Sequence, residues 1–362
     1  MKATSALCLA LALSACAGTA GRAGPVEHVA PAEHAGPEQP ASRPTDIAND
    51  EAARAHPAPS GSAVPATAER PVESAFPPKD FAPPSAESAR AGDGHWEPIG
   101  DAWLGERAAK EPRAVVRTVV HPHPESRFIT VTVAAMDLSR LSIHQVIGTD
   151  DLTWAKLPVG TSSGLVPEAD RTTLVLVMNG GFQPKHGRWG LSANGVVVTP
   201  PRKEGCTMAL YSDGSVRLGP WPSLSDSAAR MQSYRQTPPC ILENDTVHPA
   251  LVRGEDKAWA GHAADLTTRR RSALGIDASN TVLFYAIGEE ASPRWLAEAL
   301  KVAGANAAAE LDINWYWTRF LVFGSEDGAL RVTSTLIPKM EHGKTEYVER
   351  GSVRDFFYVR EK

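Results

Sequence analysis

A change of composition near residue 96 limits what this chain can fold into. Residues 17–95 contain no Leu, Trp, Tyr or Cys and hold 13 of the 29 prolines, whereas all nine tryptophans lie at or beyond Trp96. A segment this poor in large apolar side chains cannot offset the ~1–2 kcal/mol of backbone entropy lost for each residue that becomes ordered. We therefore expect a disordered, Pro- and Ala-rich tether over residues 16–95 and one folded domain over residues 96–362.

The first sixteen residues have the pattern of an export signal. Lys2 is followed by an apolar run over residues 6–13 and then by Leu13-Ser14-Ala15-Cys16. The run is shorter than the ~20 residues that a membrane-spanning helix needs, so we expect a signal peptide over residues 1–15. Leu-Ser-Ala-Cys resembles the lipobox of bacterial lipoproteins, which implies acylation of Cys16 and anchoring to a bacterial membrane, on its periplasmic or cell-surface face. The alternative is ordinary cleavage that leaves a spare thiol at Cys16.

Two cysteines, Cys206 and Cys240, remain once the N-terminal pair is assigned to export. In an oxidising compartment they can form a disulfide. The alternative is two buried free thiols, because sequence spacing does not give the distance between the two Cα atoms.

The folded part is rich in segments typical of strands. Asn194-Gly195, Ser212-Asp213-Gly214 and Ala278-Ser279-Asn280 each separate two such segments and predict three hairpins. One helix is expected, with Ser292 at its N-cap, Pro293 at its first position and Gly304 at its end. The strand segments are residues 113–120, 128–134, 141–147, 172–178, 196–198, 207–211, 216–218, 272–277, 281–287, 307–313, 321–323 and 356–359. We expect a mixed α+β fold that is a single, sheet-rich domain with few helices.

Several classes of function lack support in the sequence. There is no His-Glu-x-x-His, no Walker loop, no Rossmann glycine fingerprint and no Cys-x-x-Cys. The net charge of −5 argues against nucleic acid as a partner. The sequence thus predicts no metal and no cofactor.

Three segments carry candidate chemistry. Asn179, Gly180 and Gly181 follow a buried strand and favour backbone N–H groups that converge on a phosphate oxygen or a sugar hydroxyl, unless they form only a plain turn. Arg271 enters a strand beside small residues and suits bidentate contact with phosphate, unless it belongs to a solvated loop.

The third segment is Glu310-Leu311-Asp312-Ile313-Asn314. On a regular strand Glu310, Asp312 and Asn314 share one face, a spacing suited to stabilising a developing cation and orienting water. The alternative is a polar sheet face that bonds nearby backbone.

In this order, the three segments resemble the phosphodiester glycosidase family. The family pattern is Asn-Gly-Gly-Phe-Phe, then Gly-Leu with a hairpin, then Arg-Thr-Ala-Ile-Gly, then a helix and Leu-Asp-Gly-Gly-Gly-Ser. This chain has Asn179-Gly180-Gly181-Phe182, Gly190-Leu191, Arg271-Ser272-Ala273-Leu274-Gly275 and Leu311-Asp312, all within residues 113–359. It departs from the pattern at residues 313–317, where Ile-Asn-Trp-Tyr-Trp replaces the glycine run.

The resemblance implies hydrolysis of a sugar-1-phosphodiester in an envelope or extracellular glycan. By position, Asp312 is the catalytic carboxylate and Glu310 assists it, while Asn179, Gly180, Gly181, Arg271 and Asn314 bind the substrate. The expected partners are a phosphorylated glycan and a membrane, the latter through the lipid anchor. Trp315 and Tyr316 either stack on a sugar ring or fill the core. The altered motif leaves a second reading open, a glycan-binding or envelope-assembly lipoprotein without turnover.

Overall fold

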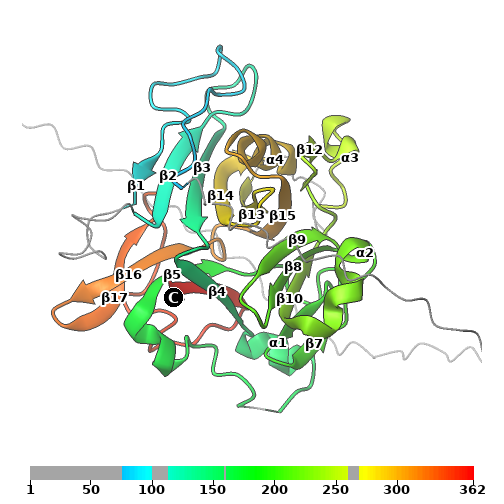
Figure 1. Ribbon diagram of the computed structural model, residues 1–362, viewed down its shortest axis with the longest axis vertical. Coiled ribbons are helices and arrows are strands. Elements are labelled where there is room, and N and C mark those ends of the chain that lie inside the picture. The colour runs from blue at the N-terminus through cyan, green and yellow to red at the C-terminus, as the bar shows by residue number, and fades with distance from the viewer. Residues whose placement is uncertain (1–75, 100–112, 159, 260–268) are drawn as a thin grey trace, which may run out of the picture. The chain divides into compact units, whose positions relative to one another are not determined.

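The computed structural model describes residues 76–99, 113–158, 160–259 and 269–362. In these residues the strands form one eight-stranded and two five-stranded sheets, and neighbouring strands run antiparallel (Figure 1). The predicted signal peptide, Cys16 and the part of the predicted tether up to residue 75 lie outside the described residues.

Each five-stranded sheet is called by its central strand, β10 or β5. The eight-stranded sheet has the order β1 (Glu97–Pro98), β2 (Val115–Val120), β3 (Thr130–Asp137), β14 (Val282–Ala291), β13 (Arg269–Ile276), β15 (Ala307–Ile313), β11 (Leu242–Glu243) and β12 (Thr246–Val247). The β10 sheet has the order β7 (Val196–Thr199), β6 (Leu191–Ala193), β10 (Met231–Thr237), β8 (Cys206–Tyr211) and β9 (Val216–Pro220). The β5 sheet has the order β17 (Ala329–Thr335), β16 (Phe320–Glu326), β5 (Leu174–Asn179), β18 (Phe356–Glu361) and β4 (Leu141–Val146).

The helices in the described residues are short. They are α1 (Thr149–Trp154), α2 (Trp221–Leu224), α3 (Pro249–Val252) and α4 (Pro293–Val302), with 3₁₀ helices η2 (Glu168–Thr173) and η3 (Ser225–Arg230). The sheet-rich character and the scarcity of helices are therefore confirmed. The α+β assignment is not, because this part of the chain is mostly β and only α4 is longer than six residues.

Local sequence signals correctly predicted several turns and one helix. Asn194 and Gly195 both have positive φ, at 50° and 80°, and join β6 to β7, as a two-residue turn of the primed type requires. The hairpins β8–β9 and β13–β14 are also present. Helix α4 begins after Ser292, and Gly304 follows it with φ of +106°, although the Ser292 side chain makes no capping bond.

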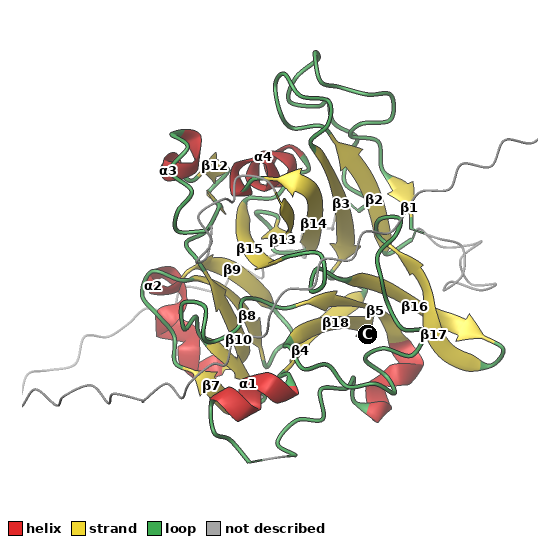
Figure 2. Ribbon diagram, turned by 180° about the vertical axis from the view of Figure 1, so that it is seen from behind, coloured by secondary structure: helices red, strands yellow, loops and turns green. Residues whose placement is uncertain are grey.

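The eight-stranded sheet is covered on both faces. One face packs against the β5 and β10 sheets and includes Leu274, Tyr285 and Leu311 in the larger core. Helix α4 covers the opposite face, over β13, β14 and β15 (Figures 1 and 2). Leu296 and Leu300 of this helix are fully buried there. The strand β5 is buried along its whole length, as expected from its apolar run.

The packed part of the chain begins earlier than Trp96. Phe76 and Phe81 pack against the core beneath α4, and the rings of Phe81 and Trp96 meet edge to face with their centroids 6.1 Å apart. The Phe81 amide donates to the Gly94 carbonyl, and the Trp96 amide donates to Asp80 Oδ1. Residues 76–95 therefore belong to the folded part, and the predicted tether boundary at 95 was wrong. Two phenylalanines suffice to dock a Pro-rich segment that has no other large apolar side chain.

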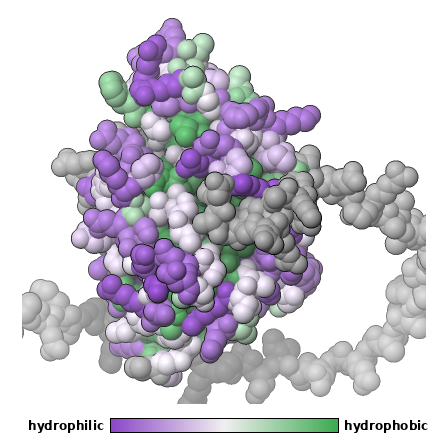
Figure 3. Space-filling view, turned by 90° about the vertical axis from the view of Figure 1, so that its left-hand side faces the viewer, coloured by the Kyte–Doolittle hydropathy of each residue, from purple (hydrophilic) through white to green (hydrophobic). Residues whose placement is uncertain are grey.

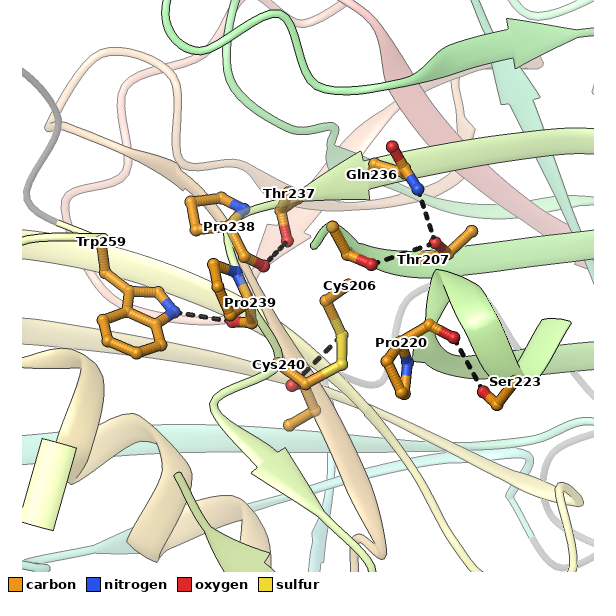
Figure 4. Close-up of a disulfide and its surroundings, with 12 residues drawn as sticks. Cys206, Thr207, Pro220, Ser223, Gln236, Thr237, Pro238, Pro239, Cys240 and Trp259 are labelled. Atoms are coloured by element: carbon orange, nitrogen blue, oxygen red, sulfur yellow. Dashed lines mark hydrogen bonds between the residues drawn. A yellow bond between two sulfur atoms is a disulfide. The ribbon is translucent and has the colours of Figure 1, made fainter. Parts of the chain in front are cut away.

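Cys206 and Cys240 are joined as a disulfide, and their Cα atoms are 4.7 Å apart (Figure 4). Both residues are buried. The bond links β8 of the β10 sheet to the segment that precedes β11 of the eight-stranded sheet. Of the two alternatives that the spacing left open, the structure has the disulfide.

The surface is mainly polar on the face drawn in Figure 3, where hydrophobic residues occupy small areas among hydrophilic and intermediate ones. No helix within the described ranges has the length and apolar composition needed to cross a membrane.

Candidate active site

Asn179 lies at the end of β5, where the β5 sheet meets the eight-stranded sheet. Its side-chain oxygen accepts from the Tyr285 hydroxyl at 2.8 Å and from the Arg319 amide at 3.0 Å. Its amide nitrogen donates to Ser272 Oγ at 3.0 Å, and Ser272 Oγ donates to the Asp312 carbonyl at 3.0 Å. Asn179 thus joins the three candidate segments. It does so as a buried structural hub, with its hydrogen-bonding groups already engaged.

The two glycines after Asn179 are needed for close packing. The Gly180 amide donates to the Asp355 carbonyl at 3.0 Å, and the Gly181 amide donates to Asp355 Oδ2 at 3.3 Å. A Cβ on Gly180 would collide with Asp355, and one on Gly181 would lie 2.7 Å from Arg235 Cζ. Neither glycine has positive φ. The expected concavity for a phosphate is therefore absent at these two residues, because the backbone carbonyl and the carboxylate of Asp355 accept their two N–H groups.

A β-bulge on β15 breaks the expected alternation of its polar side chains. Arg271 of β13 pairs with Ile313 and Ala273 pairs with Glu310, so β15 has one extra residue between these two pairs. The bulge turns Glu310 and Ile313 toward the same face. The prediction that Glu310, Asp312 and Asn314 share one face was therefore wrong, since a period of two holds only without a bulge.

Glu310 and Arg271 form an ion pair beneath the site. Arg271 donates to Glu310 Oε1 at 2.7 Å and to the Trp259 carbonyl at 3.2 Å, and both charged side chains are fully buried. Burial raises the pKa of Glu310 to about 7, against the opposing effect of Arg271. Glu310 Oε2 is buried and has no hydrogen-bond partner within the described part of the chain. The pair belongs to the interior of the eight-stranded sheet and not to an open surface.

Asp312 forms a separate pair with Arg354, which lies two residues before the start of β18. Arg354 donates to Asp312 Oδ2 at 2.7 Å, and the two side chains are 8% and 9% exposed. Asp312 Oδ1 accepts from the Ile313 amide at 2.9 Å. Burial raises the pKa of Asp312 to about 6, and Arg354 acts in the opposite direction. The carboxyl group therefore loses its proton close to neutral pH.

Residues 314–317 form a turn that carries aromatic side chains. Asn314 Oδ1 accepts from the amides of Tyr316 and Trp317, so this side chain orders the turn. Trp315 is 55% exposed and Tyr316 is 69% exposed, which excludes the alternative that they fill the core.

Two arginines stack on this turn. The Arg270 guanidinium lies 3.8 Å from the Trp315 ring centroid, and the Arg354 guanidinium lies 5.0 Å from that of Trp317. Such contacts hold the aromatic rings and the cations in fixed relative positions.

A cleft of about 650 Å³ opens beside this turn. Tyr316, Trp317 and Arg319 line one part of it, and the segment from Glu341 to Val353 supplies other lining residues, among them His342, Glu346 and Arg350. Arg319 lies 3.7 Å from Glu346. Trp317 contacts both this cleft and Arg354, so the Asp312–Arg354 pair lies directly behind the cleft wall. Among the candidate residues from the sequence, Asp312 is the carboxylate associated with an accessible space.

Sequence reasoning missed a second buried charge cluster next to Gly181. Arg235 donates to both oxygens of Asp355, at 2.8 and 3.1 Å, and is 1% exposed. Asp151 Oδ2 accepts from the Asp355 amide at 2.8 Å, while Asp151 Oδ1 is buried and finds no partner in residues 76–99, 113–158, 160–259 and 269–362. Burial and the nearby Asp355 raise the pKa of Asp151 to about 7. These three residues are far apart in sequence, and no local pattern links them.

Residues 160–164, Gly-Thr-Ser-Ser-Gly, match the spacing of a serine nucleophile motif. In α/β-hydrolases that motif lies in a sharp turn between a strand and a helix. Here it lies in an irregular segment between α1 and η2, and Ser162 Oγ donates to the Ile147 carbonyl at 2.7 Å. The geometry does not expose this hydroxyl as a nucleophile.

Comparison with known proteins gives a distant likeness in fold. No family model and no curated protein matches the chain. Among solved structures, the catalytic domain of zebrafish N-acetylglucosamine-1-phosphodiester alpha-N-acetylglucosaminidase, auto-inhibited by its pro-peptide, is 12% identical, with a TM-score of 0.44 over 74% of this chain and 88% of that one. A hypothetical protein from Synechocystis is 10% identical, with a TM-score of 0.40 over 69% of this chain and 62% of that one. A Burkholderia pseudomallei protein described as exported is 11% identical, with a TM-score of 0.26 over 64% and 74%.

Proposed function

We propose that this protein hydrolyses the glycosidic bond of a sugar-1-phosphodiester in an envelope or extracellular glycan. The observation that carries the proposal is the Asp312–Arg354 pair behind a cleft that combines aromatic and cationic side chains. The order of motifs that resembles the phosphodiester glycosidase family supports it.

The reaction needs little acid catalysis from the protein, because a phosphate oxygen is a good leaving group. Water attacks the anomeric carbon, the bond from this carbon to the phosphate oxygen breaks, and a phosphomonoester leaves with the electron pair. The ionised Asp312 carboxylate stabilises the oxocarbenium-like transition state or accepts the proton from water. Its pKa of about 6 leaves it mostly ionised at neutral pH.

The cleft suggests which groups contact the substrate. Arg319 and Arg350 are the cations that line it, and we assign them to the phosphate. Tyr316 and Trp317 offer rings on which a sugar can stack. Arg271 is fully buried against Glu310, so we assign this pair to support of the site. The same supporting role fits Asn179, Gly180 and Gly181, which bond other protein groups.

A second candidate function is glycan binding without turnover. It is favoured by the fact that Glu310 and Asp312 are each already bound to an arginine, whereas Trp315 and Tyr316 are more than half exposed. An aromatic surface of this kind can bind sugars without any ionised carboxylate at the anomeric carbon.

We also propose that the protein is exported and anchored through an acylated Cys16. The disulfide between Cys206 and Cys240 supports export, since such bonds persist in oxidising compartments and are rare in the cytosol. The anchor itself rests on the resemblance of residues 13–16 to a lipobox.

A substrate screen separates the two functions. The purified protein is incubated with phosphodiesters that carry different sugars at the phosphate, and release of the free sugar is measured. Hydrolysis that is lost in Arg350→Ala and retained in an Arg253→Ala control, which removes an exposed arginine that does not line the cleft, supports the proposal. Absence of turnover together with saturable glycan binding that depends on Tyr316 contradicts it and establishes the second function.

A further inference from the structure

A second cavity, of about 260 Å³, lies between the outer edge of β4 and the β10 sheet. It has no residue in common with the cleft described above. The volume is well above the ~30 Å³ that one water molecule occupies in the liquid. Space of this size beside a sheet edge requires an explanation.

Gln145 contributes a buried side-chain amide to the wall of this cavity. It is 3% exposed, it lines the cavity, and neither its side-chain amide nitrogen nor its amide oxygen has a hydrogen-bond partner among the residues that the structure describes. Buried amide groups are almost always paired, and each unpaired group costs about 1–3 kcal/mol. Gln145 therefore presents one donor and one acceptor to whatever occupies the cavity.

Other polar groups are arranged from the floor of the cavity to its mouth. Ser233 and Tyr358 are buried, whereas Asn194 and Gln232 are exposed. The Gln232 amide donates to Asn194 Oδ1 at 3.0 Å, which holds the two mouth residues together. A ligand can thus enter past neutral amides and meet Gln145 deeper in the cavity.

The charges around the cavity argue against an anionic ligand. Asp170 is the charged side chain that lines it, and Asp170 is engaged by the Tyr358 hydroxyl and by Arg360, 3.3 Å away. Burial lowers the pKa of His144, with a further contribution from Arg360, so this ring is neutral at neutral pH. Ile143 and Leu210 add an apolar wall.

We infer that this cavity binds a neutral, hydroxylated ring such as one sugar residue. The hydroxyl groups of a sugar satisfy both atoms of the Gln145 amide, and its C–H face packs against Ile143 and Leu210. Specificity in small-molecule sites commonly arises from a few placed polar groups beside apolar surface. The inference concerns a site separate from the proposed reaction and does not depend on it.

Methyl NMR spectra of the intact protein locate the binding. Methyl α-glucoside is titrated into protein labelled at Ile and Leu methyl groups, with inorganic phosphate as the second probe. We expect saturable shifts at Ile143 and Leu210 with the glucoside and none with phosphate. Absence of shifts at these two residues at high glucoside concentration means that only water fills the cavity, and that result overturns the inference.

A leucine substitution tests the role of Gln145. Gln145→Leu removes the unpaired amide, so we expect at least tenfold weaker glucoside binding with an unchanged or higher Tm. Gln236→Leu is the matched control, because Gln236 is equally buried but bonds the backbone of Gly190 and Arg202 and the Thr207 hydroxyl. The control should lose stability. Glucoside binding that survives in Gln145→Leu with its shifts still at Ile143 contradicts the inference.

Discussion

Asp312 carries a buried charge that Arg354 partly offsets, and the proposed reaction depends on that charge. We expect Asp312→Asn to keep the size of the side chain, remove the charge and lower kcat about 10²–10³-fold, the usual effect of losing one charge-stabilising group. Hydrolysis of the sugar-1-phosphodiester found in the screen is the measurement.

A matched control separates catalysis from the loss of an ion pair. Asp137 is also buried and accepts from Arg140 at 2.8 Å, but it lies in β3 and does not line the cleft. Asp137→Asn should change Tm while leaving kcat within about twofold of the original protein. Near-normal turnover in a folded Asp312→Asn protein would show that this carboxylate is structural.

Asp151 predicts a pH-dependent effect on stability. Its pKa is raised from the ordinary value of 3.8 to about 7, mainly by burial and then by Asp355. The folded state therefore holds a proton that the unfolded state has lost between these two values, and stability falls as the pH rises through this window. Asp151→Asn stays neutral and still offers an oxygen to the Asp355 amide.

The free energy of unfolding, measured in urea at about pH 4 and pH 8, checks this prediction. We expect the variant to gain about 2–4 kcal/mol over the original protein at the higher pH and little at the lower one. A difference between the two proteins that stays constant with pH would mean that Asp151 is already ionised in the folded state.

Some residues of the charged clusters could be predicted from the sequence and others could not. Asp312 could be chosen from a motif, because its neighbours in sequence identify it. Arg354, its partner, and Arg235, which binds Asp355, could not, because the aspartate that each arginine pairs with is at least 42 positions away in the sequence. An arginine in a polar segment is usually exposed, and only tertiary contacts bury these two.

The same difference applies to whole strands and turns. Those determined by a few neighbouring residues could be predicted from the sequence, and those determined by distant contacts could not. The hairpins at Asn194-Gly195 and at residues 278–280 were predictable, since turn chemistry is contained within a few residues. The sequence did not predict β10, because arginine and glutamine side chains usually lie on the surface. In the fold Arg235 and Gln236 are both buried and hydrogen-bonded. The bulge in β15 was also missed, and it separated Glu310 from Asp312.

The contribution of the disulfide to stability can be tested directly. Cys206 and Cys240 are 34 positions apart and link β8 to the start of β11. Closing a loop of this length contributes about 4 kcal/mol in the chain-entropy model. We expect Cys206→Ala with Cys240→Ala to lower the free energy of unfolding by about that amount, measured in urea. Reduction of the unmodified protein should produce a similar loss, and equal stability with and without reductant would contradict the prediction.

The whole molecule combines a folded part that includes Phe76 with an N-terminal segment whose role rests on the sequence alone. Phe76, Phe81 and Trp96 dock the start of the folded part. None of the contacts described for the domain requires Cys16. A change at Cys16 should therefore leave the domain intact while altering where the protein is found.

Cys16→Ser tests the proposed anchor. Acyl chains add about 0.8 kcal/mol for each buried methylene, and more than one chain makes attachment effectively permanent. The variant lacks the sulfur on which acylation depends, so we expect it to move from the membrane fraction to the soluble fraction of the exporting cell. The Tm and the disulfide of the released domain should be unchanged, which shows that folding is not the cause. Continued membrane association of the variant would contradict the lipoprotein proposal, because attachment would then have to come from another part of the chain.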